Sequence, residues 1–198
     1  MQITERQHAI ILGTMLGDGC LERNGKNIRL RLEHGISQQE YLMWKFTELN
    51  TLVTGKPMNV RALHKKSNKF YESLRIYTYS NVALEQYWNM FYPEGKKKVP
   101  KEIGCLLTHP LSLALWFMDD GYKRNDCNAF RLSTDGFEES DQRILCDTLS
   151  KNFGISSTLH RKGATWNIYI PQKSSRRFVE VIKPFTVPSL RYKITLAP

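Results

Sequence analysis

Two short apolar segments that end in the same acidic turn constrain this chain most. Residues 11–19 read Ile-Leu-Gly-Thr-Met-Leu-Gly-Asp-Gly, and residues 113–121 read Leu-Ala-Leu-Trp-Phe-Met-Asp-Asp-Gly. The final aspartates, Asp18 and Asp120, lie 102 positions apart in a chain of 198 residues. Glycine and aspartate commonly end helices and open turns, so one such turn is ordinary. Two of them, each opening one half of the chain, indicate an internal duplication.

The segments after each motif repeat the same plan. Alternating apolar and polar residues predict a strand at 28–33 in the first half and at 129–134 in the second. Ile28 and Phe130 each lie 10 positions after the motif aspartate. The other predicted elements are helices over 41–52 and 81–91 with strands at 60–64 and 71–78 in the first half, and helices over 138–153 and 173–182 with strands at 157–161 and 166–170 in the second.

This pattern predicts an α+β fold of two pseudo-symmetric repeats. We expect the order helix, strand, strand, helix, strand, strand, helix in each, or αββαββα. We place the first repeat at residues 1–95, a linker at 96–109 and the second repeat at 110–198.

Helix signals sharpen several boundaries. Pro110 suits the first turn of the second motif helix, and Gly154 suits the left-handed end of the helix over 138–153. Asn81 is a candidate helix cap, and Ser37-Gln-Gln-Glu40 is interpreted as a capping box. The helix that follows this box is expected to bury one stripe, made of Tyr41, Leu42, Trp44, Lys45, Phe46, Leu49 and Leu52.

The two motif helices are apolar nearly all round, which predicts that they are buried. Gly13 and Gly17 share one helix face, where each costs about 1 kcal/mol relative to alanine. We expect another helix to approach that face, and the second motif helix is the nearest candidate. Packing about a pseudo-twofold axis would bring Asp18 and Asp120 together at the repeat interface. The alternative is that the two aspartates occupy unrelated surface turns.

Two carboxylates placed together repel each other and face the negative ends of both helix dipoles. Bound cations would relieve both effects. Oxygen ligands, with no histidine or cysteine expected nearby, favour Mg²⁺ over zinc. The expected cofactor is Mg²⁺, with Mn²⁺ as a substitute, and neither zinc nor an organic cofactor.

The charge of the chain predicts a polyanionic partner. There are 29 lysines and arginines against 19 aspartates and glutamates, a net charge of +10. This favours nucleic acid first and an anionic membrane surface second. A basic ribosomal role is the plainer alternative.

The rest of the composition predicts a protein without membrane spans or disulfides. The four cysteines form no C-x-x-C pair, so we expect reduced thiols. No apolar run reaches the ~18 residues of a membrane span. No targeting segment is expected before Ile11, so the protein should act in the compartment of its synthesis, either a bacterial or phage-infected cytoplasm or an organelle interior.

The motif residues resemble those of the LAGLIDADG homing endonucleases, in particular the monomeric branch with two motifs in one chain. The similarity covers nearly the whole chain and includes Leu16-Gly17-Asp18, Trp116-Phe-Met-Asp-Asp-Gly121, Lys96-Lys-Lys-Val-Pro100, Ile182-Lys-Pro-Phe185 and Tyr192-Lys193. The resemblance implies that each repeat has a saddle-shaped antiparallel sheet lying in the DNA major groove. It also implies that both strands are cut across the minor groove beneath the motif helices, leaving 3′ overhangs.

The resemblance also implies roles for the motif residues. The acid before the final glycine is the family's metal ligand, which corresponds to Asp18 and Asp120. The preceding carbonyls, from Gly17 and Asp119, are further candidate ligands. Neither motif carries the family's earlier acid, which is not the metal ligand. Leu115 stands where the family often has glycine, so a less close helix approach is expected there than at Gly13.

Basic and polar side chains complete the predicted site. Lys97 and Lys193 each follow the last helix of a repeat, where the resemblance implies one active-site lysine per strand. The plainer interpretation of residues 96–98 is a solvated charge run. The predicted DNA contacts alternate along strands or occupy turns, although each is also a plausible ordinary surface residue. They are Arg29, Arg31, Glu33, Lys65, Lys66, Lys69, Arg75, Tyr77, Lys123, Arg131, Ser133, His160, Arg161, Lys162, Asn167 and Tyr169.

These expectations combine into one main hypothesis. The chain is predicted to be a monomeric, Mg²⁺-dependent, site-specific endonuclease that acts on double-stranded DNA with a long, asymmetric target. One alternative is an RNA maturase, with host intron RNA as its partner, or a non-cleaving DNA-binding protein on the same scaffold. A generic basic α+β nucleic-acid domain is the third interpretation.

Overall fold

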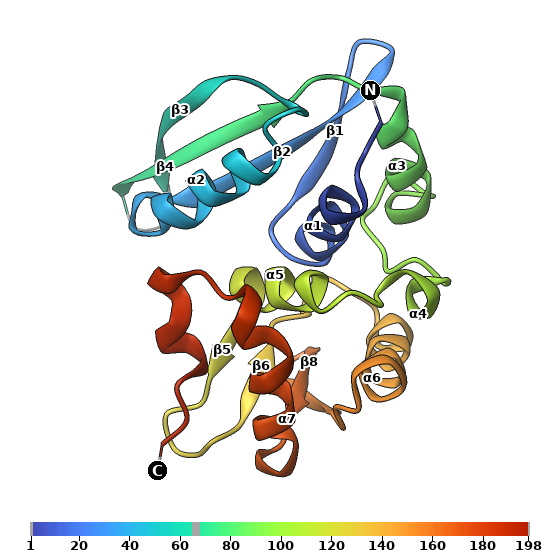
Figure 1. Ribbon diagram of the computed structural model, residues 1–198, viewed down its shortest axis with the longest axis vertical. Coiled ribbons are helices and arrows are strands. Elements are labelled where there is room, and N and C mark those ends of the chain that lie inside the picture. The colour runs from blue at the N-terminus through green and yellow to red at the C-terminus, as the bar shows by residue number, and fades with distance from the viewer. Residues whose placement is uncertain (1, 65–67, 198) are drawn as a thin grey trace.

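The computed structural model of the protein describes residues 2–64 and 68–197. Two α+β repeats stack on one another, with one helix of each side by side between them (Figure 1). The first repeat contains α1 (Glu5–Leu16), β1 (Cys20–Asn24), β2 (Asn27–Gly35), α2 (Gln39–Glu48), β3 (Val53–His64), β4 (Lys69–Thr78) and α3 (Glu85–Phe91). The second contains α5 (Pro110–Asp120), β5 (Gly121–Lys123), β6 (Phe130–Leu132), α6 (Glu139–Phe153), β7 (Thr158–Lys162), β8 (Thr165–Ile170) and α7 (Gln172–Ile182), and the short α4 (Ile103–Leu106) precedes it.

Each repeat has a four-stranded antiparallel sheet, and the two sheets share one strand order, β1-β2-β4-β3 and β5-β6-β8-β7. The registers correspond as well, because Arg31 lies opposite Tyr77 in the first sheet and Arg131 lies opposite Tyr169 in the second. The prediction of tandem αββαββα repeats is confirmed. The residue pattern did not locate β1 and β5.

Local signals placed several helix ends correctly. Pro110 begins α5, and Gly154 ends α6 with a left-handed φ of 67°. The Asn81 side chain accepts a backbone N–H from the helical turn that follows it. The predicted capping box at 37–40 is wrong: a 3-10 turn, Ile36–Gln38, occupies this segment, and α2 begins after it without a side-chain cap.

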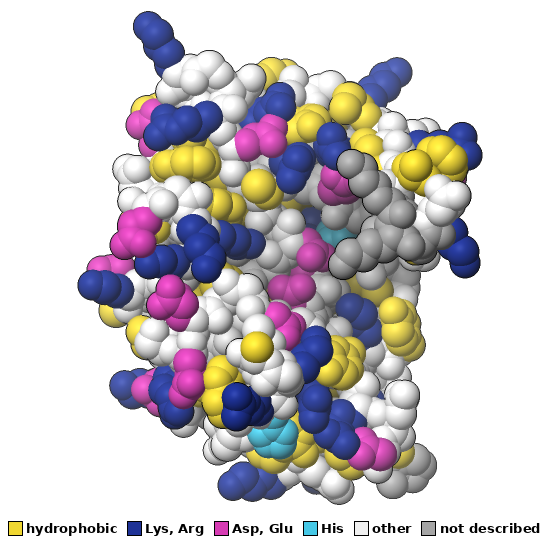
Figure 2. Space-filling view, turned by 180° about the vertical axis from the view of Figure 1, so that it is seen from behind, with side chains coloured by type: hydrophobic (Ala, Val, Ile, Leu, Met, Phe, Trp, Pro, Cys, Tyr) yellow, Lys and Arg dark blue, Asp and Glu magenta, His cyan; other side chains and the backbone are white. Residues whose placement is uncertain are grey.

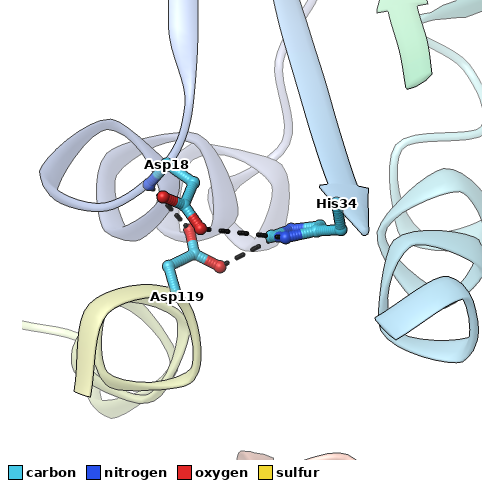
Figure 3. Close-up of side chains that lie close together, drawn as sticks. All are labelled: Asp18, His34 and Asp119. Carbon is cyan, nitrogen blue, oxygen red and sulfur yellow. Dashed lines mark hydrogen bonds and ion pairs between the residues drawn. The ribbon is translucent and has the colours of Figure 1, made fainter. Parts of the chain in front are cut away.

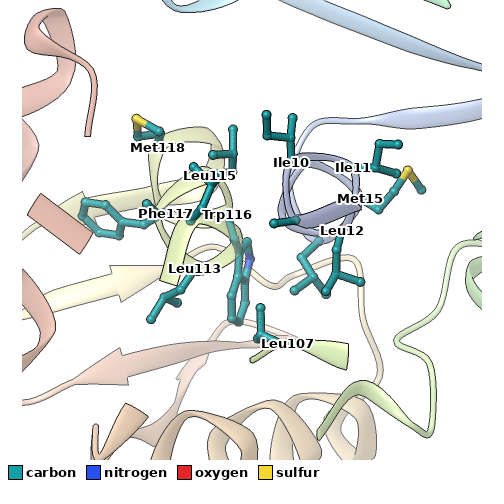
Figure 4. Packing of buried hydrophobic residues seen from close by; sticks show 14 of the residues in the cluster. Ile10, Ile11, Leu12, Met15, Leu107, Leu113, Leu115, Trp116, Phe117 and Met118 are labelled. Atoms are coloured by element: carbon teal, nitrogen blue, oxygen red, sulfur yellow. The ribbon is translucent and has the colours of Figure 1, made fainter. Parts of the chain in front are cut away.

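The helices α1 and α5 pack directly against each other in the core (Figure 4). A Cβ at Gly13 would lie 2.2 Å from the backbone oxygen of Ser112, so only glycine allows this approach. Ser112 Oγ also donates a 2.8 Å hydrogen bond to the Ala9 carbonyl. The close approach expected at Gly13 is therefore confirmed. Leu115 does not prevent it, because Ser112 is the small residue that α5 presents at this contact.

Two predictions from the composition concern the cysteines and membrane-spanning helices. All four cysteines carry free thiols, as expected. Within residues 2–64 and 68–197, no helix is both long and apolar enough to cross a lipid bilayer.

Candidate functional site

The two motif acids lie at the same end of the α1–α5 pair. Asp120 is the last residue of α5, whereas α1 ends at Leu16 and Asp18 follows in a turn. Gly17 makes room at this point, because a Cβ there would lie 2.5 Å from the Cβ of Asp119. The convergence of the helix ends brings three carboxylates together.

Crowding changes the protonation of these acids. Burial and the charges of Asp18 and Asp119 raise the pKa of Asp120 to about 7, although Lys97 and Lys193 act in the opposite direction. Burial and the Asp119 charge also raise the pKa of Asp18. A raised carboxyl pKa means that the deprotonated form is disfavoured. A divalent cation bound to these oxygens would favour that form.

Two lysines reach the acids from outside the helices. Lys97 Nζ donates hydrogen bonds to the carbonyl oxygens of Gly17 (2.7 Å) and Gly19 (2.9 Å). Lys193 Nζ donates to the carbonyl oxygen of Met118 (2.7 Å). Burial lowers the pKa of both ammonium groups, and the nearby acids act in the opposite direction. The structure thus brings all four predicted catalytic side chains to one place.

Asp119 is predicted to act only through its backbone carbonyl, as a metal ligand, but its side chain also makes contacts. Its side chain is fully buried, and Oδ1 accepts hydrogen bonds from Lys45 Nζ and from the Tyr41 hydroxyl, both at 2.8 Å. The other oxygen, Oδ2, accepts the backbone N–H of Asp18 at 3.3 Å. Lys45 and Tyr41 belong to α2, so this carboxylate joins the second repeat to the first.

His34 completes this group, which corrects the expectation that no histidine lies near the acids (Figure 3). Its Nε2 lies 3.1 Å from Lys45 Nζ, and its Nδ1 lies 3.8 Å from Asp18 Oδ2. Burial and the Lys45 charge lower the pKa of His34 to about 4, so the ring is neutral at pH 7. Asp18, His34 and Asp119 offer ligand atoms within 4.8 Å of one another. Within this group, Asp119 already forms an ion pair with Lys45.

Two features of the sequence could have indicated this buried group. His34 continues the core-facing alternation of β2 that begins at Ile28, and Lys45 lies within the buried stripe of α2. A charged or titratable side chain on a buried face needs a partner. The partner of Lys45 is Asp119, 74 positions away, so only the tertiary structure identifies it.

The outer face of the first sheet presents a connected row of charged side chains. Arg29 and Arg31 both pair with Glu22. Arg75 pairs with Glu33 at 2.7 Å. Each of these side chains is partly exposed, with the arginines oriented by carboxylates. This face can therefore meet a polyanion with its guanidinium groups already held in place.

The outer face of the second sheet combines an arginine with stacked rings. Arg131 lies near Tyr169, which stacks on His160 with ring centroids 4.1 Å apart. Asn167 shares this face but is fully buried. When its amide nitrogen faces Asp135, that nitrogen lies 3.1 Å from both carboxylate oxygens. Asn167 is therefore withdrawn as a predicted base contact, because neighbouring groups already cover and bind it.

The remaining predicted DNA contacts are partly or fully exposed where the structure describes them. Lys65 and Lys66 lie outside the described residues. Lys162 forms an exposed ion pair with Asp135 at 3.4 Å. The others are Lys69, Tyr77, Lys123, Ser133 and Arg161.

Two hollows border the motif acids. One is lined by residues that include Asp18, Arg31 and His34, and the other by residues that include Lys97 and Asp120. Figure 2 shows a hollowed face with acidic side chains near its middle and lysine and arginine side chains around them. Acids that bind cations, surrounded by basic groups that bind phosphates, suit chemistry on a nucleic-acid backbone.

Comparisons with known proteins agree with this geometry. The sequence matches the LAGLIDADG DNA endonuclease family over residues 8–178. It is 31% identical over 212 residues to the DNA endonuclease I-ChuI of Chlamydomonas applanata, across 98% of this chain and 97% of that relative. It is also 31% identical over 195 residues to the cytochrome b mRNA maturase bI2 of Debaryomyces hansenii, across 93% of this chain and 72% of that relative. The fold is similar to that of the homing endonuclease I-WcaI bound to its DNA recognition sequence, with a TM-score of 0.92 at 22% identity, covering 100% of this chain and 89% of that one.

Proposed function

The chain belongs to the LAGLIDADG DNA endonuclease family, and on this premise we propose that it is a site-specific homing endonuclease that cuts both strands of an asymmetric DNA target. The observation that carries the proposal is the convergence of Asp18, Asp120, Lys97 and Lys193 at one end of α1 and α5. We further propose that the protein acts as a monomer, because a single chain supplies both acids and both lysines. The linker, placed at residues 96–109, would carry Lys97 to the site.

The donor set fits a hard divalent cation. Asp18 and Asp120 offer carboxylate oxygens, Gly17 and Asp119 offer backbone carbonyls, and the neutral His34 lies 3.8 Å from Asp18 Oδ2. Mg²⁺ is proposed as the cation, with Mn²⁺ as a substitute. When bound, such an ion lowers the pKa of a coordinated water and shares the negative charge of the phosphate oxygens.

The chain's own residues would do the rest. The two acids would hold the cations beside the scissile phosphates of the two strands near the helix ends, and each lysine would balance the charge that develops on the phosphate oxygens. Lys97 and Lys193 already point their ammonium groups at the motif carbonyls, at 2.7 Å from Gly17 O and Met118 O. We propose 3′ overhangs and cleavage across the minor groove, as the family resemblance implies, with the two sheets following the major groove on either side.

The experiment is a cleavage assay on supercoiled plasmid DNA. The plasmid would carry the uninterrupted form of the host gene, or a target selected from a randomised library for cleavage. We expect Mg²⁺-dependent linear product from the natural protein. Asp18→Asn and Asp120→Asn should each lose cleavage by at least about 10³-fold, because the charge that holds the cation is removed, while DNA binding persists.

Asp126→Asn is the matched control. Asp126 is an exposed aspartate that pairs with Arg124, and its variant should cleave like the natural protein. Full cleavage by either motif variant contradicts the proposal.

A second candidate function is RNA maturation, which the similarity to maturase bI2 favours. The test is splicing of the host intron RNA with and without the protein. If Asp18→Asn and Asp120→Asn support splicing as well as the natural protein does, the maturase function is independent of the acids. Splicing activity without any DNA cleavage would replace the main proposal.

A further inference from the structure

The two motif acids are held by different means. Asp120 is the last residue of α5, so the helix itself fixes its backbone, whereas Asp18 lies in the turn after α1 has ended at Leu16. The backbone N–H of Asp18 is accepted instead by Oδ2 of Asp119 at 3.3 Å. In the first motif the position that corresponds to Asp119 is Gly17, which has no side chain. The support given to Asp18 therefore has no equivalent on the other side of the pseudo-twofold axis.

Two residues of α2 fix the carboxylate that provides this support. Lys45 Nζ and the Tyr41 hydroxyl both donate to Asp119 Oδ1 at 2.8 Å. All three side chains are fully buried, with Lys45 and Asp119 each 0% exposed. Charge-assisted hydrogen bonds are the stronger ones, and removing one partner of a buried pair is costly. The carboxylate is thus anchored to a helix of the opposite repeat.

We infer that Lys45 and Tyr41 are positioning residues for Asp18: they fix the carboxylate of Asp119, which holds the backbone of the acid. The inference rests on the proposed endonuclease function and adds an asymmetry to it. The strand cut that depends most on Asp18 requires this anchor, whereas the cut that depends most on Asp120 does so to a smaller extent.

The first test compares the two strand cuts in Tyr41→Phe, which removes a single hydroxyl. The full-length variant is assayed under single-turnover conditions on supercoiled plasmid carrying the target, with Mg²⁺. We expect one strand cut to slow about tenfold, the loss of one charge-assisted hydrogen bond, while the dissociation constant for DNA changes less than about twofold. Nicked circles should accumulate, with the nick mapped to one strand. Lys45→Met should slow the same strand by about 100-fold, because it removes the charged donor.

Tyr87→Phe is the matched control. Tyr87 is also fully buried, and its hydroxyl lies 2.6 Å from His8 Nδ1 on the far part of the first repeat. This variant loses a buried hydroxyl of the same kind, but the ratio of the two strand rates should equal that of the natural protein. A purely structural role for Tyr41 would slow both strand cuts equally and would be reproduced by Tyr87→Phe.

The second test needs no cleavage. Hydrogen exchange of the Asp18 amide, measured by NMR on the full chain, should be at least about fivefold faster in Tyr41→Phe than in the natural protein. Tyr87→Phe should leave it unchanged. Equal slowing of both strands, or unchanged Asp18 exchange in Tyr41→Phe and Lys45→Met, overturns the inference. Faster Asp18 exchange in a protein that cleaves no DNA would support the anchor and contradict the endonuclease proposal instead.

Discussion

The two repeats share one order of elements, yet they hold their acids differently. In the second repeat the motif helix runs as far as Asp120, whereas in the first it stops early and Asp18 depends on Asp119 of the other repeat. The glycine that permits this contact, Gly17, occupies the place of Asp119 in the first motif. Pseudo-symmetry therefore describes the backbone, while the side chains at the axis are complementary to each other.

The two sheets share one strand order but differ in strand length and in the side chains on their outer faces. The ribbon of β3 and β4 has strands of 12 and 10 residues, whereas β7 and β8 have 5 and 6. The first sheet presents arginines paired with carboxylates, with Arg29 also over the Tyr77 ring, and the second presents His160 stacked on Tyr169 beside Arg131. Two unlike faces on one scaffold suit the asymmetric target that we propose.

Among the differences between the repeats, the largest expected effect on cleavage concerns the two lysines. Lys97→Met and Lys193→Met should each slow single-turnover cleavage by about 100-fold, because an ammonium group is removed from beside the reacting phosphate. Lys97 holds two carbonyls and Lys193 holds one, so Lys97→Met should be the slower. Lys98→Met is the control, since Lys98 pairs with Glu94 at the surface. A natural rate in either motif-lysine variant would remove that lysine from the site.

The next effect concerns the helix interface. Gly13→Ala should lower the free energy of unfolding by about 2–3 kcal/mol, since the new methyl group would overlap the backbone of Ser112 and push the helices apart. Gly104→Ala is the matched control, because a Cβ there would make only an ordinary 3.7 Å contact. Urea denaturation measures both. Equal stabilities of the two variants would show that α1 can move away from α5 at little cost.

The pH dependence of stability separates the two kinds of aspartate. The pKa of Asp120 is raised from 3.8 to about 7 on folding, so the folded protein binds more protons between these values and loses stability as the pH rises through them. The free energy of unfolding of Asp120→Asn should therefore exceed that of the natural protein by about 2 kcal/mol at pH 8 without divalent metal. At pH 5 the difference should be smaller. Mg²⁺ should reduce the difference by stabilising the natural protein.

Asp126→Asn tests an aspartate whose ionisation has the opposite effect on stability. Arg124 lowers the pKa of Asp126 to about 2. The ionised Asp126 therefore stabilises the folded protein above pH 3.8, and this stabilisation is lost as the pH falls. Its variant should show no gain at pH 8. Thermal denaturation at both pH values decides between these outcomes, and a gain in Asp126→Asn equal to that in Asp120→Asn would contradict the assignment of repulsion to the motif acids.

The smallest effect compares the sheets. Arg75→Ala should weaken DNA binding by about 1 kcal/mol and relax the preference for one base pair, if its guanidinium reads a base edge. Arg131→Ala should weaken binding to a similar extent. Asn167→Ala should leave the preference at every base pair unchanged, because the Asn167 side chain is buried. Equilibrium binding to a panel of single-base variants of the target tests all three.

Much of the fold could be predicted because its signals are local. Strand alternation from Ile28, the proline at the start of α5 and the glycine at the end of α6 each depend on a few neighbouring residues. The predicted capping box is wrong because the chain forms a 3-10 turn over Ile36–Gln38, and such turns are frequent at the start of α-helices. The edge strands β1 and β5 were not predicted, because pairing with a neighbouring strand, rather than their own composition, makes them strands.

The residues of the candidate site also fall into those that the sequence indicates and those that only the tertiary structure identifies. The repeated Asp-Gly turn and its half-chain spacing are features of the sequence that drew attention to Asp18 and Asp120, whereas the family resemblance selected Lys97 and Lys193. The tertiary structure alone decided that Asp119 is bound by Lys45 and Tyr41, that His34 lies beside Asp18, and that Asn167 is covered. Periodicity reports which face of an element is buried, but the partner of a buried charge is chosen by the packing of distant segments.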